Sequence, residues 1–222
     1  MAIKLKNVWY RYPGSRNWVL KGISIGFSRE EACAVVGPNA SGKTTMLKIV
    51  SLLYKPTRGE VEAWNTKYWD LPPSKALMLR RRVVYVHEKP ILLRGTVAYN
   101  IGYGLILRGH SIDEAKQRAR AILDSLGLSY LADKEAKSLS AGEAQLTAIL
   151  RAIVIKPDIV VLDEPISHLD RSKRRILVQL LARMKRKGIG LVIATHDLIL
   201  AETLADRIIY LERGAIVGVE RK

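Results

Sequence analysis

One stretch of the sequence has the residue types and the spacing needed to bind phosphate. Residues 37–44 read Gly-Pro-Asn-Ala-Ser-Gly-Lys-Thr, which fits the pattern G-x-x-x-x-G-K-[ST]. Gly37 and Gly42 permit a tight backbone that approaches a phosphate closely. In such loops the lysine, here Lys43, reaches the β- and γ-phosphates, and the hydroxyl of Thr44 binds Mg²⁺. The predicted nucleotide ligands are Gly37, Pro38, Asn39, Ala40, Ser41, Gly42, Lys43, Thr44 and Thr45.

The segments on either side of this loop decide between a phosphate site and a simple glycine turn with an exposed lysine. Residues 32–36 are small, apolar and β-prone, which predicts a buried strand. Residues 45–53 have helical composition. A strand, a glycine-rich loop and a helix together direct backbone N–H groups and the positive end of the helix dipole at a phosphate. The sequence therefore favours a nucleotide site.

A second group of residues supplies acidic chemistry. Residues 159–162 are apolar and β-prone, and the strand that they predict ends in Asp163 and Glu164. A strand end holds a carboxylate rigidly near the metal of a phosphate-loop NTPase. We expect Asp163 to hold Mg²⁺, through water, and Glu164 to act as the general base that polarises the attacking water. The alternative is a strand followed by an ordinary acidic turn.

Composition limits the class of protein. The 222 residues include 37 Lys and Arg against 21 Asp and Glu, a net charge of +16, which suits a polyanion or an anionic membrane face. The basic clusters at 80–82, 171–175 and 185–187 alternate with apolar positions at helical spacing, so a solvated helix face is the competing interpretation. The single cysteine, Cys33, rules out a disulfide framework and fits a small buried side chain in a cytosolic protein.

The sequence gives no sign of a membrane span. The first six residues lack the apolar core of a signal peptide. The most apolar stretch, residues 91–107, contains Arg94, Asn100 and several glycines. It is too short and too interrupted to cross a bilayer.

Strands and helices alternate along the chain, and one block is wholly helical. Ser111 to Glu114 and Ser140 to Glu143 match capping boxes that begin helices. The pattern predicts an α/β fold with a mixed sheet, an N-terminal antiparallel β portion and an inserted helical subdomain at about 88–155. Strands are expected at 3–10, 22–27, 32–36, 60–64, 83–86, 159–162, 191–195, 208–211 and 215–219, and helices at 45–53, 114–126, 140–155, 171–187 and 198–205.

Further motifs resemble those of the ATP-binding-cassette (ABC) ATPases. Residues 139–145, Leu-Ser-Ala-Gly-Glu-Ala-Gln, are similar to the family's Leu-Ser-Gly-Gly-Gln signature. Residues 163–170 resemble its Walker B motif and D-loop, and residues 193–197 resemble its switch-histidine segment. The resemblance implies one phosphate-loop NTPase domain, 1–222, with a RecA-like core at about 1–87 and 156–222.

The resemblance also implies roles for individual residues. Tyr12, 25 positions before Gly37, lies where the family has an aromatic side chain that stacks on adenine. His196 would bind the γ-phosphate and orient the water, and Asp170 belongs to the D-loop. The signature faces the ATP held by an opposite subunit, so two chains enclose two MgATP molecules in a homodimer or a pair of cassettes. The signature residues that act in trans are Ser140, Ala141, Gly142 and Glu143.

Three positions depart from the family pattern. Ala141 replaces a glycine, and Glu143 replaces the usual glutamine but completes the capping box. Glu88 stands where the family has a glutamine that touches the metal. Glu88 is therefore a third candidate metal ligand, beside Thr44 and Asp163. The alternative is that Glu88 turns away and pairs with a basic residue of the helical lobe or of a permease.

Residues 89–109 resemble the corresponding stretch of importer cassettes, nearest to those for oxyanions such as tungstate, molybdate or phosphate. This implies an ATPase at the cytoplasmic face of the membrane that drives separate permease subunits and, through them, serves an extracytoplasmic solute-binding protein. No direct nucleic-acid partner is expected. Two alternatives stay open: an exporter or lipoprotein-release cassette, and a soluble cassette that uses its positive charge to act on nucleic acid or ribosomes.

Overall fold

The computed structural model describes all residues, 1–222, and the chain divides into two compact units. The first unit contains Met1–Tyr85, Asp158–Glu164 and Leu181–Lys222. The second contains Val86–Pro157 and Pro165–Leu180. The division into a RecA-like core and a helical subdomain at the predicted boundaries stays a prediction.

The first unit contains an antiparallel sheet close to the chain's beginning. Its four strands have the order β2-β1-β4-β5. β1 pairs antiparallel with both β2 and β4, as the predicted N-terminal β portion requires. The bounds are β1 Ile3–Tyr10, β2 Leu20–Phe27, β4 Arg58–Ala63 and β5 Thr66–Lys67. The two-residue β5 was not predicted.

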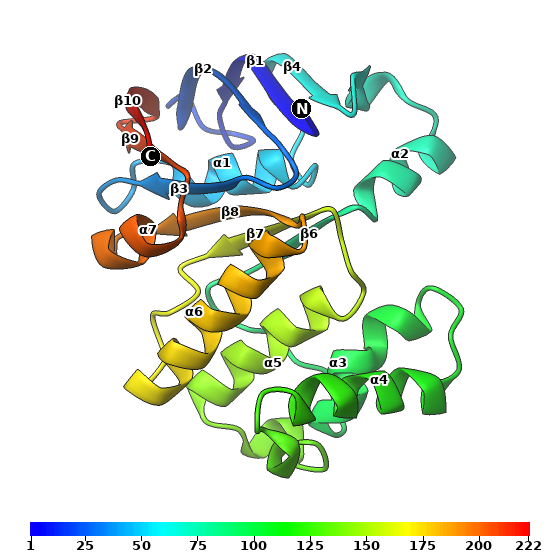
Figure 1. The fold of residues 1–222 in the computed structure, drawn as a ribbon. Helices are drawn as coiled ribbons and strands as arrows, with labels where there is room; N and C mark the ends of the chain where they lie inside the picture. Colours follow the sequence, from blue (N-terminus) through cyan, green and yellow to red (C-terminus); the bar gives the residue numbers. More distant parts are fainter. The chain divides into compact units, whose positions relative to one another are not determined.

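The second sheet of this unit has six strands in the order β10-β9-β3-β8-β7-β6 (Figure 1). β3 lies parallel to both β8 and β9, β7 lies parallel to β8, and β9 pairs antiparallel with β10. Every residue of β3, β7 and β8 is buried, which explains why these segments read as continuous apolar runs. The bounds are β3 Ala32–Val36, β6 Val83–Val86, β7 Ile159–Asp163, β8 Gly190–Thr195, β9 Arg207–Glu212 and β10 Ala215–Arg221.

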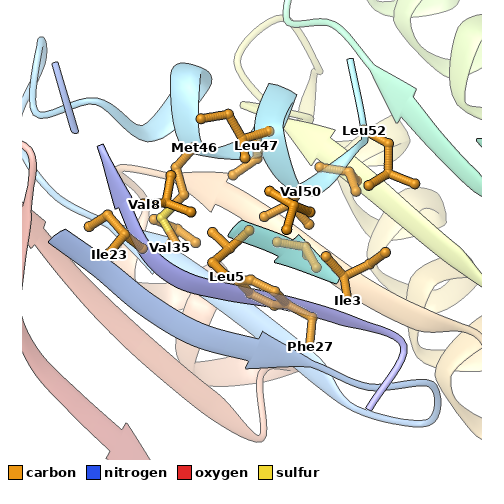
Figure 2. Packing of buried hydrophobic residues seen from close by; sticks show 14 of the residues in the cluster. Ile3, Leu5, Val8, Ile23, Phe27, Val35, Met46, Leu47, Val50 and Leu52 are labelled. Carbon is orange, nitrogen blue, oxygen red and sulfur yellow. The ribbon is translucent and has the colours of Figure 1, made fainter. Parts of the chain in front are cut away.

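Helix α1 (Lys43–Val50) packs against strands of both sheets and supplies much of the core of the first unit. Figure 2 shows Met46, Leu47 and Val50 of α1 packed against residues of β1 and β2. α2 (Pro73–Arg80) is a short, largely exposed helix, and α7 (Leu198–Leu204) packs on β3 and β8.

Buried Arg207 connects three strands of the first unit. Its Nη2 donates to the carbonyl of Gly26 (2.6 Å), to Glu31 (3.0 Å) and to the Sγ of Cys33 (3.1 Å). Cys33 is only 1% exposed, which confirms its predicted place in the core. Burial raises the pKa of its thiol to about 12, although the neighbouring guanidinium opposes the shift.

The second unit is helical. α3 (Val97–Ile106) packs against α4 (Ile112–Asp124) and α5 (Ala141–Ile153), and the first part of α6 (Arg171–Arg186) belongs to the same unit. The capping box predicted at Ser140 is present. The one at Ser111 is only half correct: Ser111 caps α4, but the carboxylate of Glu114 pairs with His110 and Arg118 instead. None of the helices has the length and the apolar character needed to span a bilayer.

Candidate nucleotide-binding site

The predicted phosphate loop connects β3 to α1, and close packing requires its first glycine. A Cβ on Gly37 would lie 2.1 Å from the carbonyl oxygen of Leu211, so no other residue fits without a shift of the backbone. Gly42 precedes α1 with φ 105°, and no side chain caps the helix. The N–H groups of the first turn are therefore left for an external acceptor. Pro38, Asn39 and Ala40 are exposed at the tip of the loop, Thr44 is half-buried, and Ser41 and Thr45 are buried.

Two buried side chains fit a phosphate at this loop. Lys43 is 7% exposed, and its Nζ donates to the carbonyl oxygens of Gly37 (2.7 Å) and Pro38 (3.1 Å). The hydroxyl of Ser41 is buried and has no hydrogen-bond partner. A buried ammonium that contacts only carbonyl oxygens, next to an unsatisfied hydroxyl, suits an incoming anion that pairs with both.

Strand register brings the other predicted groups to the same edge. Val36 of β3 is paired with Thr195 of β8, and Ala194 of β8 is paired with Asp163 of β7. The three strands are parallel, so the phosphate loop, His196 and Glu164 all follow strand ends at one side of the sheet. This is the carboxyl edge, where open α/β sheets bind ligands.

Asp163 has a partner that the sequence did not reveal. Its side chain is buried, and Oδ2 accepts a hydrogen bond from the hydroxyl of Tyr85 in β6 at 2.8 Å. Thr44 lies in the first turn of α1, and α1 packs on β7. A carboxylate and a hydroxyl are the hard oxygen donors that suit Mg²⁺, which takes its other ligands from water and phosphate. The residues present therefore fit the metal.

Glu164 and His196 form a pair at the same edge. Glu164 has φ 44°, a left-handed conformation unusual for a residue with a side chain, and its N–H donates to the carbonyl of Ala194. Nδ1 of His196 lies 2.9 Å from Oε2 of Glu164. The imidazole is 68% exposed and the carboxylate only 12%. Strained backbone at a strand end is typical of functional sites, and here the Glu164 carboxylate lies next to the exposed imidazole.

Tyr12 stands close to the beginning of α1. Its hydroxyl lies 3.0 Å from the hydroxyl of Thr45, and its ring packs edge-on against Tyr10 and Tyr54. Tyr12 is 39% exposed. Tyr10 and Tyr54 form an aromatic cluster with Tyr12 and hold it in place, a contact that the sequence alone did not reveal.

The signature residues begin α5 in the second unit. Ser140 accepts from the N–H of Glu143, and the carboxylate of Glu143 accepts from the N–H of Ser140 at 2.8 Å. Ser140 and Ala141 are exposed, whereas Gly142 is buried. A Cβ on Gly142 would lie 2.9 Å from the carbonyl oxygen of His168, so this glycine is required for packing against the D-loop segment. Glu143 also pairs with Lys134, a residue that the sequence analysis did not single out.

Two further predicted residues lie in the second unit. Asp170 caps α6: it accepts from the N–H of Lys173, from the Lys173 ammonium and from Ser172. The hydrogen bond from the Lys173 ammonium is the main cause that holds the pKa of Asp170 well below its usual range. Glu88 is half-buried on the loop after β6, and none of the ion pairs of the chain involves it. Its role as a metal ligand stays a prediction.

Comparisons with known proteins identify the family. The family model described as ABC transporter matches residues 20–167. The chain is 34% identical over 208 residues to the phosphate import ATP-binding protein PstB 2 of Natronomonas pharaonis, covering 90% of this chain and 73% of the relative. It is 35% identical over 202 residues to the "Probable anion import ATP-binding protein" of Haloferax volcanii, covering 85% of this chain and 70% of the relative.

Solved structures agree with the sequence relatives. The ATP-binding cassette MJ0796, solved as a dimer in a post-hydrolysis state with ADP and Pi, is 33% identical and matches with a TM-score of 0.89. The match covers 99% of this chain and 98% of that one. This likeness confirms the predicted fold, a phosphate-loop NTPase with antiparallel and mixed sheets. The chain is therefore an ATPase cassette of the ABC transporter family.

Proposed function

We propose that this chain is the ATP-hydrolysing subunit of an ABC importer, and that it dimerises on MgATP to drive a separate membrane permease. The observation that supports hydrolysis most directly is the shared strand edge. There the phosphate loop, Glu164 and His196 follow three parallel strands, and Asp163 is the last residue of one of them. In this proposal residues 37–45 bind the phosphates and Tyr12 stacks on adenine.

In this proposal separate residues hold the metal, accept the proton and bind the γ-phosphate. Mg²⁺, held by Thr44, Asp163 and Glu88, would neutralise charge on the phosphates. Glu164 accepts the proton of the attacking water through the carboxylate that faces His196. A histidine donates from both ring nitrogens only as imidazolium, so His196 can bind Glu164 and the γ-phosphate together in that form.

Dimerisation is proposed from the exposed signature and from the relatives. Ser140 and Ala141 lie exposed at the N-terminus of α5, where free amides and the helix dipole favour an anion. MJ0796 was solved as a dimer with ADP and Pi. A second copy of this chain would then present residues 140–143 and Asp170 to the ATP of the first.

The direction and the solute are proposed from the named relatives. Two of them are named for phosphate import and anion import, which supports an oxyanion such as phosphate, tungstate or molybdate as the solute class. The surface proposed to receive the permease includes Ile91, which is 77% exposed, and the half-buried Leu92 and Leu93. The chain would then act at the cytoplasmic face of the membrane, with a solute-binding protein as an indirect partner.

Replacement of the general base tests this proposal. Glu164→Gln keeps the size and hydrogen bonding of the side chain but removes the proton acceptor, so phosphate release should fall by about 10²-fold or more. ATP should still bind, and a dimer should accumulate in size-exclusion chromatography with MgATP. A variant that releases phosphate at the normal rate would place the base elsewhere.

The competing function, a soluble cassette that acts on nucleic acid, rests on the net charge of +16. Some of the basic side chains form ion pairs within the chain: Arg82 pairs with Asp158, and Arg207 pairs with Glu31. Titration of RNA or DNA at several salt concentrations separates the two functions. A steep loss of affinity with salt from a tight starting value would favour the nucleic-acid role.

A further inference from the structure

Lys134 contacts the signature residue that departs from the family pattern. Its Nζ lies 3.1 Å from Oε1 and 3.0 Å from Oε2 of Glu143, and so spans both carboxylate oxygens. The Glu143 side chain is 11% exposed and that of Lys134 is 36% exposed. An ion pair with one partner this buried is screened much less than a surface pair.

The backbone of Lys134 is fixed. Its N–H donates to the carbonyl of Leu131, and its carbonyl accepts from the N–H of Val97 in the first turn of α3. The neighbouring Glu135 is paired with Thr96 in an isolated antiparallel bridge. The ammonium therefore reaches Glu143 from an anchored segment.

Glu143 creates an electrostatic problem that a glutamine would not. It is the third residue of α5, whose free N–H groups and dipole attract an anion. A carboxylate at this point opposes that attraction, because it repels any phosphate brought to the helix N-terminus. A cation on the same carboxylate cancels the repulsion.

From this geometry we propose that Lys134 is a positioning residue for the signature: it neutralises Glu143 and keeps the N-terminus of α5 able to receive the ATP phosphate of a second chain. This inference rests on the proposed function. Lys134 does not touch ATP; it acts through Glu143, whose carboxylate also holds the N–H of Ser140.

The charges around Glu143 support this assignment. Burial by itself raises the pKa of Glu143, but hydrogen bonds from Ser140 and Lys134 outweigh it, and the pKa lies below the usual value. Lys173 of α6 also interacts electrostatically with Glu143, and it interacts in the same way with Asp170 and Tyr130. Because Lys173 is already paired with Asp170, Lys134 is the cation that is committed to Glu143.

The test uses full-length chains with Lys134→Gln, Glu143→Gln and both changes, with Lys137→Gln as a control that removes the same charge from an exposed position three residues away. ATP-driven dimerisation is measured in the Glu164→Gln background, and kcat and KM for ATP are measured without it. Lys134→Gln should weaken dimerisation by roughly tenfold or more, because an uncompensated negative charge then faces the phosphate. Lys137→Gln should resemble the parent.

Two readouts separate this role from a merely structural one. In the presence of Glu143→Gln, adding Lys134→Gln should change dimerisation less than about twofold, since no charge remains to be neutralised. The deficit of Lys134→Gln alone should shrink as pH falls, because protonation of Glu143 removes the repulsion, and Lys134→Arg should restore function.

The outcomes are distinguishable. If the parent chain neither hydrolyses ATP nor dimerises with it, the proposed function fails. If the parent does both and Lys134→Gln equals it, or if the deficit of Lys134→Gln persists unchanged beside Glu143→Gln, the assignment of Lys134 is overturned. If Lys134→Gln folds poorly, dimerisation of Glu143→Gln is compared with that of the double variant. Similar dimerisation supports a role of Lys134 through Glu143, and clearly weaker dimerisation of the double variant overturns it.

Discussion

The hydrogen bond from Tyr85 to Asp163 allows a quantitative test of how the carboxylate of Asp163, the proposed metal ligand, is held in place. Asp163 is 2% exposed, and the hydroxyl of Tyr85 donates to it at 2.8 Å. Tyr85→Phe keeps the ring and removes only this hydroxyl. A hydrogen bond to a charged group contributes about 1.5–3 kcal/mol to the free energy of unfolding. For a chain of this length each kcal/mol corresponds to about 2–4 °C, so the melting temperature should fall by roughly 3–12 °C.

Tyr210→Phe is a matched control. The hydroxyl of Tyr210 also donates to a carboxylate, that of Glu220, at 3.0 Å, but this carboxylate is exposed. Its loss should change stability by no more than about 0.5 kcal/mol. Differential scanning fluorimetry without nucleotide compares the two variants with the parent.

An activity measurement extends the test to function. If Tyr85 orients Asp163 toward Mg²⁺, the Mg²⁺ concentration that gives half-maximal ATPase should rise about tenfold or more in Tyr85→Phe. It should not change in Tyr210→Phe. Equal melting temperatures for both variants, together with an unchanged Mg²⁺ requirement, would refute the idea that Tyr85 holds Asp163 in place as a metal ligand.

Three further predictions concern a charge, a surface and a thiol. Glu88→Gln should tighten binding of a fluorescent ATP analogue clearly in EDTA and little in Mg²⁺, because the metal offsets the repulsion between carboxylate and phosphate; equal affinities in EDTA would place Glu88 outside the site. Ile91→Asp should abolish co-purification with the proposed permease without lowering the melting temperature. The same change at the exposed Ile112 should leave both co-purification and the melting temperature unchanged. If Ile91→Asp still co-purifies, Ile91 does not belong to the interface. Cys33 should resist iodoacetamide in the native chain and react in denaturant, and rapid labelling of the native chain would contradict its burial. Burial raises the pKa of its thiol from 9.0 to about 12. The contribution of Cys33 to stability should therefore be lost as pH rises through that interval.

Features encoded in consecutive residues could be predicted from the sequence. β1 and β6 have the predicted limits, because apolar periodicity and turn residues define them locally. The phosphate loop and the capping box at Ser140 are likewise local patterns, and both are present in the structure.

Contacts between distant residues could not be predicted. Tyr85 reaches Asp163 only because β6 lies beside β7 in the sheet, and nothing in either segment encodes that order. Glu114 matched the capping-box pattern, but in the structure its carboxylate pairs with Arg118 and His110 instead of the backbone N–H of Ser111. Such pairings depend on tertiary packing, which overrides the local pattern.

In the proposed dimer two copies of this chain share each ATP site, and a complementation experiment tests this arrangement most directly. Lys43→Ala removes the phosphate contact of one copy, and Ala141→Glu places a negative charge at the exposed first position of α5 in the other. Each variant alone should be inactive. Mixed together, they form one intact site from the phosphate loop of the second variant and the signature of the first, so the mixture should hydrolyse ATP. A mixture as inactive as its components would contradict a site shared between two chains.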